Sequence, residues 1–355
     1  MKKVLKRIFL TLAILLGVIL LAAVVLFTWL TITEFRPKAQ EAVSVADNVE
    51  QAPAGEEYTL LSWNVGYCAL GKESEFFMDG GKEVRPDSES VIHKNYDGIL
   101  DVIQKENPDF LFLQEVDSDS KRSYYMDEVS ALRGALEQPS AYALNYKCNY
   151  VPYPLPTLGK VTSGLLSFSR YRISEATRIS LPCPFSWPVS VANLKRCLLV
   201  TRVPLEGREQ ELVLVNLHLE AYDDGEGKKQ QTEQLLRFLQ EEYEKGNYVI
   251  AGGDWNQVFP KTLESFPNTH EDLWTPGVLE AVPEGWAYAY DVDGQTCRLL
   301  NKPYDPADKE GTQYYVIDGF LVSPNVQIMD VKTLTELDFE FSDHNPVRLK
   351  IRLGA

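Results

Sequence analysis

Polar side chains that can do chemistry stand at the ends of apolar runs in this sequence. In VIAGGDWNQVF, residues 249–259, an apolar run reaches two glycines and is followed by Asp254 and Asn256. Burying a carboxylate or an imidazole in such a run is costly unless the group has a partner or a metal ion. The pattern recurs with Asn64 in LLSWNV, Glu115 in FLFLQEV, Asn216 and His218 in LVLVNLHLE, Asp318 in YYVIDGFLV, and Asp343 and His344 in FSDHNPV. This recurrence favours one common site over a set of unrelated turns.

Each of these residues has a plainer interpretation when it is taken alone. Asp254, Asn256 and Asn64 fit strand-closing turns, because Gly, Asp and Asn are common turn residues. His218 fits a core histidine with satisfied hydrogen bonds, and Asp318 fits a strand cap. The SDHNP motif fits a turn whose bend comes from its Asn-Pro pair. The inference of a site therefore depends on the set and its order.

Strands and helices must alternate along the chain to position these side chains. Apolar runs typical of strands cover residues 58–65, 109–117, 164–173, 195–203, 211–220, 248–256, 313–323 and 346–353. Helices are predicted over 90–107, 125–137 and 228–245. Strands mixed with helices over about 300 residues predict one α/β (α+β) domain of two packed sheets flanked by helices.

Two long stretches, 66–89 and 260–312, show no clear periodicity. Loops longer than about 12–15 residues are often lids or binding loops, although both stretches also have room for short helices. The first contains the aromatic insert SEFFMDGG, residues 74–81.

The N-terminus predicts a membrane anchor. The basic segment 1–7 is followed by residues 8–30, which carry no charge. About 20 apolar residues span a bilayer as a helix, and a basic flank stays in the cytoplasm. A cleaved signal peptide is the alternative, but its apolar region usually runs only about 7–15 residues. The small-residue site SVA at 44–46 lies far beyond the apolar run.

The remaining chain divides into a tether and one domain. Residues 31–55 are polar, contain Pro37 and Pro53, and predict a linker. Residues 56–355 would form the functional domain on the outer side of a plasma membrane. We expect a single-pass protein with a cytoplasmic N-terminus and an extracytoplasmic, monomeric domain.

The net charge argues against loose nucleic-acid binding. The chain has 35 Lys+Arg and 51 Asp+Glu residues, a formal net charge of −16. Such a field repels polyanions at long range. It leaves room for a small phosphate compound that is bound through a metal ion.

The cysteines do not form a metal-binding or disulfide pattern. Five are scattered along the chain without a CxxC pair. A bridge between Cys183 and Cys197 is possible, but buried free thiols are favoured.

The ordered set N…QE…NxHL…GDxN…ID…SDH resembles the endonuclease/exonuclease/phosphatase superfamily. GDWN and SDH are its most specific pieces, and the resemblance covers roughly residues 56–355. It implies a four-layer α/β/β/α sandwich of two mixed sheets, here preceded by one transmembrane helix. It also implies hydrolysis of phosphate esters with Mg²⁺ or Mn²⁺.

The resemblance also implies roles for individual residues. Metal ligands would be Asn64, Glu115 and Asp343. Catalytic residues would be His218, Asp254, Asn256, Asp318 and His344. Asp254 would orient or deprotonate the attacking water and Asn256 would hold water or phosphate. His344, oriented by Asp318, would stabilise the phosphate, and His218 would act from the opposite side.

The substrate stays open at this stage between a nucleic acid, a lipid head group and a small phosphodiester. A phosphodiesterase is the main hypothesis, and a sphingomyelinase-like or phospholipase-C-like enzyme at the membrane surface is the alternative. A non-catalytic, membrane-tethered binding domain is the third.

Residues outside the ordered set give weaker signals. Arg122 fits either a phosphate contact or a solvated loop charge, and Tyr146 and Lys147 fit either a substrate groove or loop packing. His93 and His270 are expected at the surface.

Overall fold

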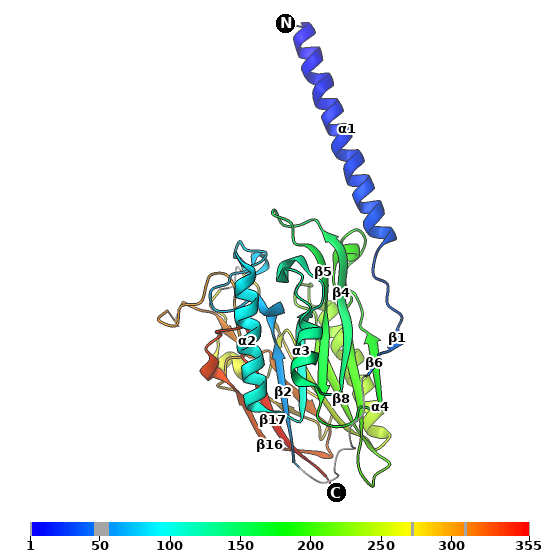
Figure 1. Ribbon diagram of the computed structural model, residues 1–355, viewed down its shortest axis with the longest axis vertical. Coiled ribbons are helices and arrows are strands. Elements are labelled where there is room, and N and C mark those ends of the chain that lie inside the picture. Colours follow the sequence, from blue (N-terminus) through cyan, green and yellow to red (C-terminus); the bar gives the residue numbers. More distant parts are fainter. Residues whose placement is uncertain (1, 46–56, 271–272, 309–310, 355) are drawn as a thin grey trace.

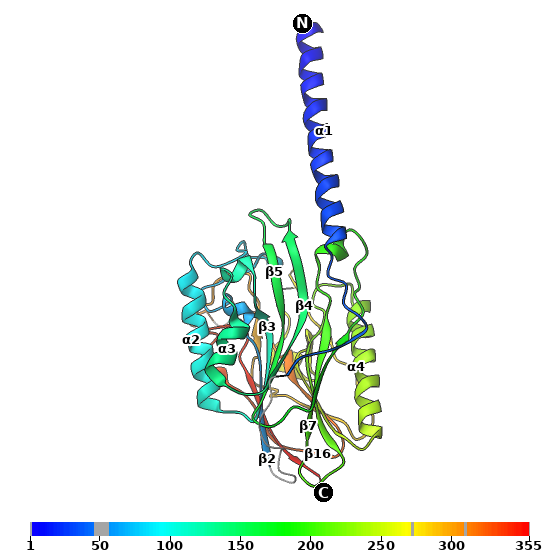
Figure 2. The same cartoon turned by 45° about the vertical axis from the view of Figure 1, so that its right-hand side comes forward.

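The computed structural model describes residues 2–45, 57–270, 273–308 and 311–354. In these residues two sheets pack face to face, with helices on their outer faces (Figure 1 and Figure 2). The first sheet has the order β1 (Gln40–Ala42), β6 (Glu175–Ser180), β7 (Cys197–Pro204), β8 (Glu211–His218), β9 (Tyr248–Asp254), β15 (Asp318–Val322) and β12 (Ala287–Ala289). The second has the order β16 (Val326–Thr333), β17 (Val347–Leu353), β2 (Glu57–Asn64), β3 (Phe110–Asp117), β5 (Gly159–Ser169) and β4 (Ser140–Val151). The predicted four-layer α/β sandwich is confirmed.

Each sheet contains a parallel pair of strands. β2 and β3 pair in parallel, and helix α2 (Glu89–Glu106) connects them. β8 and β9 also pair in parallel, through helix α4 (Glu226–Glu244). The other strand pairs in the two sheets are antiparallel, so both sheets are mixed. Each crossover helix returns the chain so that the two strands of its pair end at the same edge.

Burial on both faces of the central strands explains their continuous apolar runs. Leu60 of β2 is buried between the sheets, in a cluster that includes Leu214 of β8. Its neighbour Leu61 points to the opposite face and packs in a cluster with Ile99 of α2. Helix α4 covers the first sheet in the same way through Leu235.

Strands β4, β6 and β16 were not predicted from the sequence. β16 is largely exposed, and its apolar residues show no steady alternation. The run 313–323 forms two strands, β14 (Tyr314–Tyr315) and β15, instead of one. Helix α3 (Glu128–Leu136) begins later than expected, since Asp127 caps it by accepting a hydrogen bond from the Ser130 N–H.

Part of the expected tether belongs to the first sheet. β1 pairs antiparallel with β6, with Glu41 opposite Arg178. Residues 40–42 of the predicted linker are therefore joined to the domain as an edge strand. Residues 46–56, which complete the expected linker and include the end of the SVA site, lie outside the described residues.

Helix α1 (Lys2–Ile32) extends away from the domain (Figure 1). Among the described residues it is the helix long and apolar enough to cross a membrane. Its last turn is fastened to the domain: Leu30 is buried, and Trp187 Nε1 donates a hydrogen bond to Thr31 Oγ1 at 3.1 Å. Glu34, just after the helix, forms an ion pair of 2.8 Å with Lys195.

Candidate active site

The carboxyl ends of the two parallel pairs meet at one place. Asn64 is the last residue of β2, His218 the last of β8 and Asp254 the last of β9. In register, His218 and Asp318 lie opposite Asp254 on its two neighbouring strands. Asn64 Nδ2 joins the sheets by donating hydrogen bonds to Asp254 Oδ2 at 3.0 Å and to Glu115 Oε1 at 3.2 Å.

The two glycines before Asp254 are required by space. A Cβ on Gly252 would lie 2.2 Å from the Phe320 ring, and one on Gly253 would lie 1.9 Å from the carbonyl oxygen of Leu217. Gly253 also has a φ of +147°. The GG pair therefore lets β9 pass between its neighbouring strands and bring Asp254 to the site. The glycines serve close packing within the sheet, whereas the turn interpretation assigned them to the end of a strand.

Glu115 reaches the site through a distortion of β3. The register of β3 with β5 shifts between Leu113 and Val116, as in a β-bulge. Glu115 lies in this irregularity with a φ of +56°. Bulges re-aim side chains and are frequent near active sites. The Glu115 side chain is 24% exposed, so it is open to a ligand while its neighbours in the strand are buried.

His344 is surrounded by carboxylates. Its Nδ1 forms a hydrogen bond of 2.8 Å with Asp318 Oδ2, and its carbonyl accepts one from Trp63 Nε1 at 2.8 Å. Burial lowers the pKa of His344, but the negative charges around it, first that of Asp318, outweigh burial and raise the pKa well above its ordinary value.

The pKa of His218 is shifted in the opposite direction to that of His344. Its Nε2 lies 3.4 Å from Asp254 Oδ2 and 3.9 Å from Glu115 Oε1. Burial, and then the positive charges of Arg196 and His344, hold the pKa of His218 well below its ordinary value. Two imidazoles whose pKa values are displaced in opposite directions therefore face the same residue, Asp254.

The carboxylates of the site are crowded. Burial and the neighbouring charge of Asp318 raise the pKa of Asp254 to about 7, although His344 and Asn64 oppose the shift. Burial also raises the pKa of Asp343 to about 7, and the negative charge of Glu115 adds to this effect. Buried acidic groups gathered in this way favour a cation among them.

The predicted metal residues lie together. Asn64 contacts Glu115, and its Oδ1 accepts a hydrogen bond from the Gly66 N–H at 3.0 Å. Asp343 lies against the same glycine, because a Cβ there would be 3.0 Å from Asp343 Oδ1. Glu115 and Asp343 thus offer the carboxylate oxygens that Mg²⁺ or Mn²⁺ prefers. Asn64 turns its amide nitrogen toward Glu115, so its oxygen would reach an ion only after the amide rotates.

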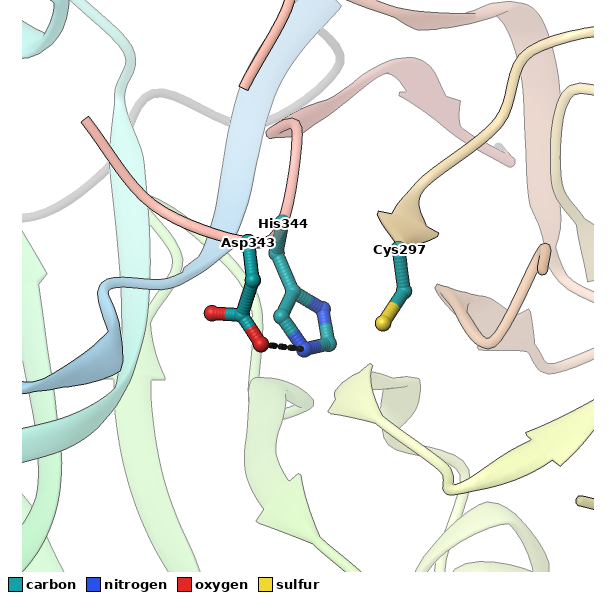
Figure 3. A group of neighbouring side chains, drawn as sticks. All are labelled: Cys297, Asp343 and His344. Atoms are coloured by element: carbon teal, nitrogen blue, oxygen red, sulfur yellow. Dashed lines mark ion pairs between the residues drawn. The ribbon is translucent and has the colours of Figure 1, made fainter. Parts of the chain in front are cut away.

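A further group surrounds His344. Figure 3 shows its imidazole between the carboxylate of Asp343 and the thiol of Cys297. Potential ligand atoms of these three residues lie within 4.8 Å of one another, as do those of Asp254, Asp318 and His344. Cys297 was not singled out in the sequence. It reaches this place through an isolated β-bridge to His344.

The site residues Glu115, His218, Asp254, Asn256, Asp343 and His344 line a cavity of about 440 Å³. The two stretches without clear periodicity both contribute to its wall, with Phe76, Phe77 and Asp79 from 66–89, and Trp274 and Leu300 from 260–312. The interpretation of these stretches as binding loops agrees with this arrangement. Tyr222 donates a hydrogen bond of 2.9 Å to Asp79, which holds this acidic residue in the wall.

Arg122 also lines the cavity, and it is not a solvated loop charge. It is 7% exposed, forms paired hydrogen bonds with both oxygens of Asp117 at 2.9 and 3.0 Å, and lies 3.6 Å from the ring centre of Tyr67. Tyr146 lines the cavity as well, whereas Lys147 is exposed. No sequence pattern points to Tyr67, whose hydroxyl is buried with no hydrogen-bond partner among the described residues.

The other singled-out residues lie away from the reacting groups. Asn216 is fully buried and joins the sheets, accepting a hydrogen bond from Gln114 at 2.8 Å and donating one to the Leu113 carbonyl at 3.1 Å. His93 is exposed on α2, as expected, whereas His270 is partly buried. All five cysteines lie in the described ranges and are free thiols. Four are buried as expected, whereas Cys183 is exposed.

Comparison with solved structures gives the same fold. A protein from Beutenbergia cavernae described as an endonuclease/exonuclease/phosphatase is similar with a TM-score of 0.56 and 18% identity, over 84% of this chain and 72% of that one. ANGEL2, a 2',3'-cyclic phosphatase, is similar with a TM-score of 0.55 and 15% identity, over 89% of this chain and 99% of that one. A family protein from Bacteroides thetaiotaomicron has a TM-score of 0.53 and 15% identity, over 85% of this chain and 99% of that one. Comparison with curated protein sequences gives no match.

The sequence comparison identifies the family. Residues 61–344 match the pattern of the Endonuclease/Exonuclease/phosphatase family, and this range includes every residue of the predicted site. Enzymes of this family generally use divalent metal ions, and the acidic groups described above suit such an ion. The chain therefore belongs to the endonuclease/exonuclease/phosphatase family and is a hydrolase of phosphate ester bonds.

Proposed function

We propose that the protein is a phosphodiesterase that uses Mg²⁺ or Mn²⁺ to direct water onto a phosphodiester. The observation that carries the proposal is the position of Asp254 Oδ2 between two imidazoles, 3.4 Å from His218 Nε2 and 3.9 Å from His344 Nε2. The carboxylates of Glu115 and Asp343 line the same cavity. A bound divalent ion would neutralise charge on the phosphate and polarise the attacking water.

The protein groups would divide the remaining work. Asp254 would accept the proton of the water, with its carboxylate held by the Asn64 amide and by the backbone N–H of Asn256 at 2.9 Å. The His344 imidazolium, held by Asp318, would stabilise negative charge on the phosphate. Neutral His218 would hydrogen-bond to the phosphate from the other side. The side-chain N–H of Asn256 donates a hydrogen bond to the Leu219 carbonyl at 2.9 Å. This bond holds Asn256 in place, and its backbone N–H in turn holds Asp254.

The charge balance supports a diester over a monoester. A monoester phosphate carries nearly two negative charges, and it needs more free positive charge than a diester does. Besides His344, the cationic residues in the described wall of the cavity are Arg122 and Arg196, and both are paired with carboxylates. Little positive charge is therefore left for a dianion.

The test compares bis(p-nitrophenyl) phosphate with p-nitrophenyl phosphate, with the full-length protein in detergent and Mg²⁺, Mn²⁺ or EDTA present. We expect turnover of the diester with either metal, slower turnover of the monoester, and none in EDTA. Replacement His344→Ala should abolish diester turnover. Activity that survives EDTA, or a preference for the monoester, would contradict the proposal.

We further propose that α1 crosses a plasma membrane with its N-terminus in the cytoplasm. Its length and apolar composition, with the basic residues Lys2, Lys3, Lys6 and Arg7 at the start, support this arrangement. Protease added to intact cells or spheroplasts should digest the domain. Protection of the domain until the membrane is lysed would show that the orientation is the opposite one.

A further inference from the structure

We infer that the substrate is a membrane lipid with a phosphodiester head group, and that its acyl chain lies in an apolar arm of the active-site cavity. The inference rests on the proposed function, because it names the substrate class of the same site. The apolar arm is defined by the cavity-lining residues Phe77, Tyr153, Leu158, Phe185, Val189 and Leu194.

The wall of the apolar arm is apolar and comes from three segments. Phe77 belongs to the 66–89 stretch, Leu158 to the hairpin between β4 and β5, and Phe185 and Leu194 to the loop between β6 and β7. Their side chains offer no charge to a sugar-phosphate backbone. An alkyl chain gains about 0.8 kcal/mol for each CH₂ group that it buries against such a wall.

The same wall is continuous with the end of α1. Leu30 of α1 is 1% exposed and packs in one apolar cluster with Leu158, and Leu26, Phe77 and Leu194 pack against that cluster. The ring of Phe27 lies edge-on to Trp187, with the ring centres 6.4 Å apart. Residues that line the cavity and residues of the apolar helix are therefore parts of one packed unit.

This contact fixes the height of the cavity relative to a bilayer. Leu26 and Phe27 lie inside the uncharged run 8–30, which must occupy the hydrocarbon layer when α1 spans the membrane. One helical residue rises about 1.5 Å, so Leu26 lies only about 6 Å below the end of the run at Leu30. Loop residues that touch this part of α1 must reach the level of the lipid head groups.

We define the rim of the apolar arm by four exposed apolar residues. Tyr153 (66% exposed) and Val189 (55%) line the cavity, and Leu155 (88%) and Trp187 (63%) each lie two residues from one of them along the chain. The tip of the β4–β5 hairpin and the domain end of α1 lie at the same end of the molecule in both views (Figure 1 and Figure 2). Exposed apolar patches of this kind mark membrane or partner contacts. The helix that enters the bilayer beside them identifies the membrane as the occupant.

A lipid could then enter the cavity without leaving the membrane plane. Its chain would stay in the apolar arm, and its phosphodiester would reach Glu115, Asp254 and His344, which line the same cavity. The reaction is hydrolysis: water attacks phosphorus, one P–O ester bond breaks, and the leaving oxygen takes up a proton. Water is the only co-reactant.

The first experiment measures inhibition, so that it does not depend on guessing the natural lipid. Full-length protein in detergent is assayed with bis(p-nitrophenyl) phosphate in the presence of lysophosphatidylcholine or glycerophosphocholine, which share a head group and differ by one acyl chain. We expect the acylated compound to inhibit at least about tenfold more strongly. Replacement Ala192→Phe, in the wall of the cavity, should remove this preference and leave the metal dependence unchanged. Equal inhibition by the two compounds would overturn the inference.

The second experiment measures turnover in vesicles of phosphatidylcholine, phosphatidylethanolamine, phosphatidylglycerol and sphingomyelin with Mg²⁺ or Mn²⁺. Replacement Leu155→Asp on the rim should lower lipid turnover at least about fivefold and leave turnover of the soluble diester unchanged. Met329→Asp is the matched control, because Met329 is also exposed (39%) but lies on β16, away from the rim.

The outcomes separate the two proposals. Turnover of bis(p-nitrophenyl) phosphate without turnover of any vesicle lipid would overturn the lipid inference and leave the phosphodiesterase standing. An equal loss of lipid turnover in Leu155→Asp and Met329→Asp would also overturn it. A protein that cleaves neither class of diester would overturn the proposed function, and the lipid inference with it.

Discussion

His344 Nδ1 and Asp318 Oδ2 lie 2.8 Å apart, and this contact joins the loop before β17 to the first residue of β15. Asp318 is also the register partner of Asp254. His344 Nε2 lies 3.9 Å from Asp254 Oδ2, so two buried carboxylates flank one imidazole. The pair is thus both a structural link between the sheets and the source of charge at the site.

Replacement Asp318→Asn tests this pair. The amide keeps the shape but removes the charge that raises the pKa of His344, so that pKa should fall. We expect kcat for a phosphodiester to fall about 10²-fold. The alkaline limb of the pH–rate profile should move to lower pH, because the cationic form of His344 is lost sooner.

The control for this variant is Asp330→Asn, which removes an exposed carboxylate from β16. It should leave kcat and the pH–rate profile unchanged. A pH–rate profile of Asp318→Asn that overlays the wild-type curve would show that the charge of Asp318 does not act on His344.

Replacement Glu115→Gln tests metal binding. Glu115 is the partly exposed carboxylate in the bulge of β3, and its amide analogue binds hard cations more weakly. We expect the Mg²⁺ concentration for half-maximal activity to rise at least about tenfold, and circular dichroism to show an intact fold. Asp101→Asn, on the outer surface of α2, is the control and should not change the Mg²⁺ titration. An unchanged titration for Glu115→Gln would remove Glu115 from the ligand set.

Replacement Gly253→Ala tests the packing that delivers Asp254. The new Cβ would meet the Leu217 carbonyl at 1.9 Å, in a backbone conformation that favours glycine. We expect the free energy of unfolding to fall by about 3 kcal/mol or more in urea titrations. Gly134→Ala is the contrasting change, since Gly134 is in helix α3 with no atom within 4 Å of the new Cβ. It should raise the stability by about 0.5–1 kcal/mol. Equal effects at both positions would refute the steric argument.

The sequence was informative where function and strand ends coincide. Asn64, His218 and Asp254 each follow a buried apolar run, so their positions could be predicted from hydrophobic pattern and residue type. The same reasoning placed α2 and α4, because their apolar residues recur at helical spacing. In these elements the local preference of the sequence and the packing in the folded protein favour the same secondary structure.

Residues whose surroundings come from distant segments could not be predicted. Cys297 lies beside His344 only because the short strand β13 (Cys297–Arg298) bridges to the loop before β17. The guanidinium of Arg122 lies against the ring of Tyr67, from a distant segment, and pairs with Asp117, five residues away along the chain. Such short strands and local ion pairs have no periodicity, so the pattern gave no sign of them. The β1 strand within the expected linker escaped notice for the same reason.

Replacement Glu242→Gln tests a charge cluster on the far side of the first sheet. Glu242 of α4 accepts hydrogen bonds from Arg202 at 2.7 and 2.9 Å, Lys245 at 2.6 Å and Asn247 at 2.9 Å. Burial raises the pKa of Glu242, but these partners outweigh burial and hold the pKa at about 2, below the ordinary 4.5. A depressed pKa stabilises the fold above pH 4.5, and this stabilisation disappears as the pH falls from 4.5 through about 2.

We therefore expect Glu242→Gln to lower the free energy of unfolding by about 1–2 kcal/mol at pH 7, after allowance for the solvent around Arg202 and Lys245. The difference from wild type should shrink steadily as the pH is lowered from 4.5 toward 2, in urea titrations at each pH. Glu241→Gln, on the exposed side of the same helix, should show no such dependence. A constant difference in the free energy of unfolding between Glu242→Gln and wild type across this pH range would contradict the prediction. Protonation of the wild-type carboxylate would then cost no stability, so the side chain would act through packing and neutral hydrogen bonds.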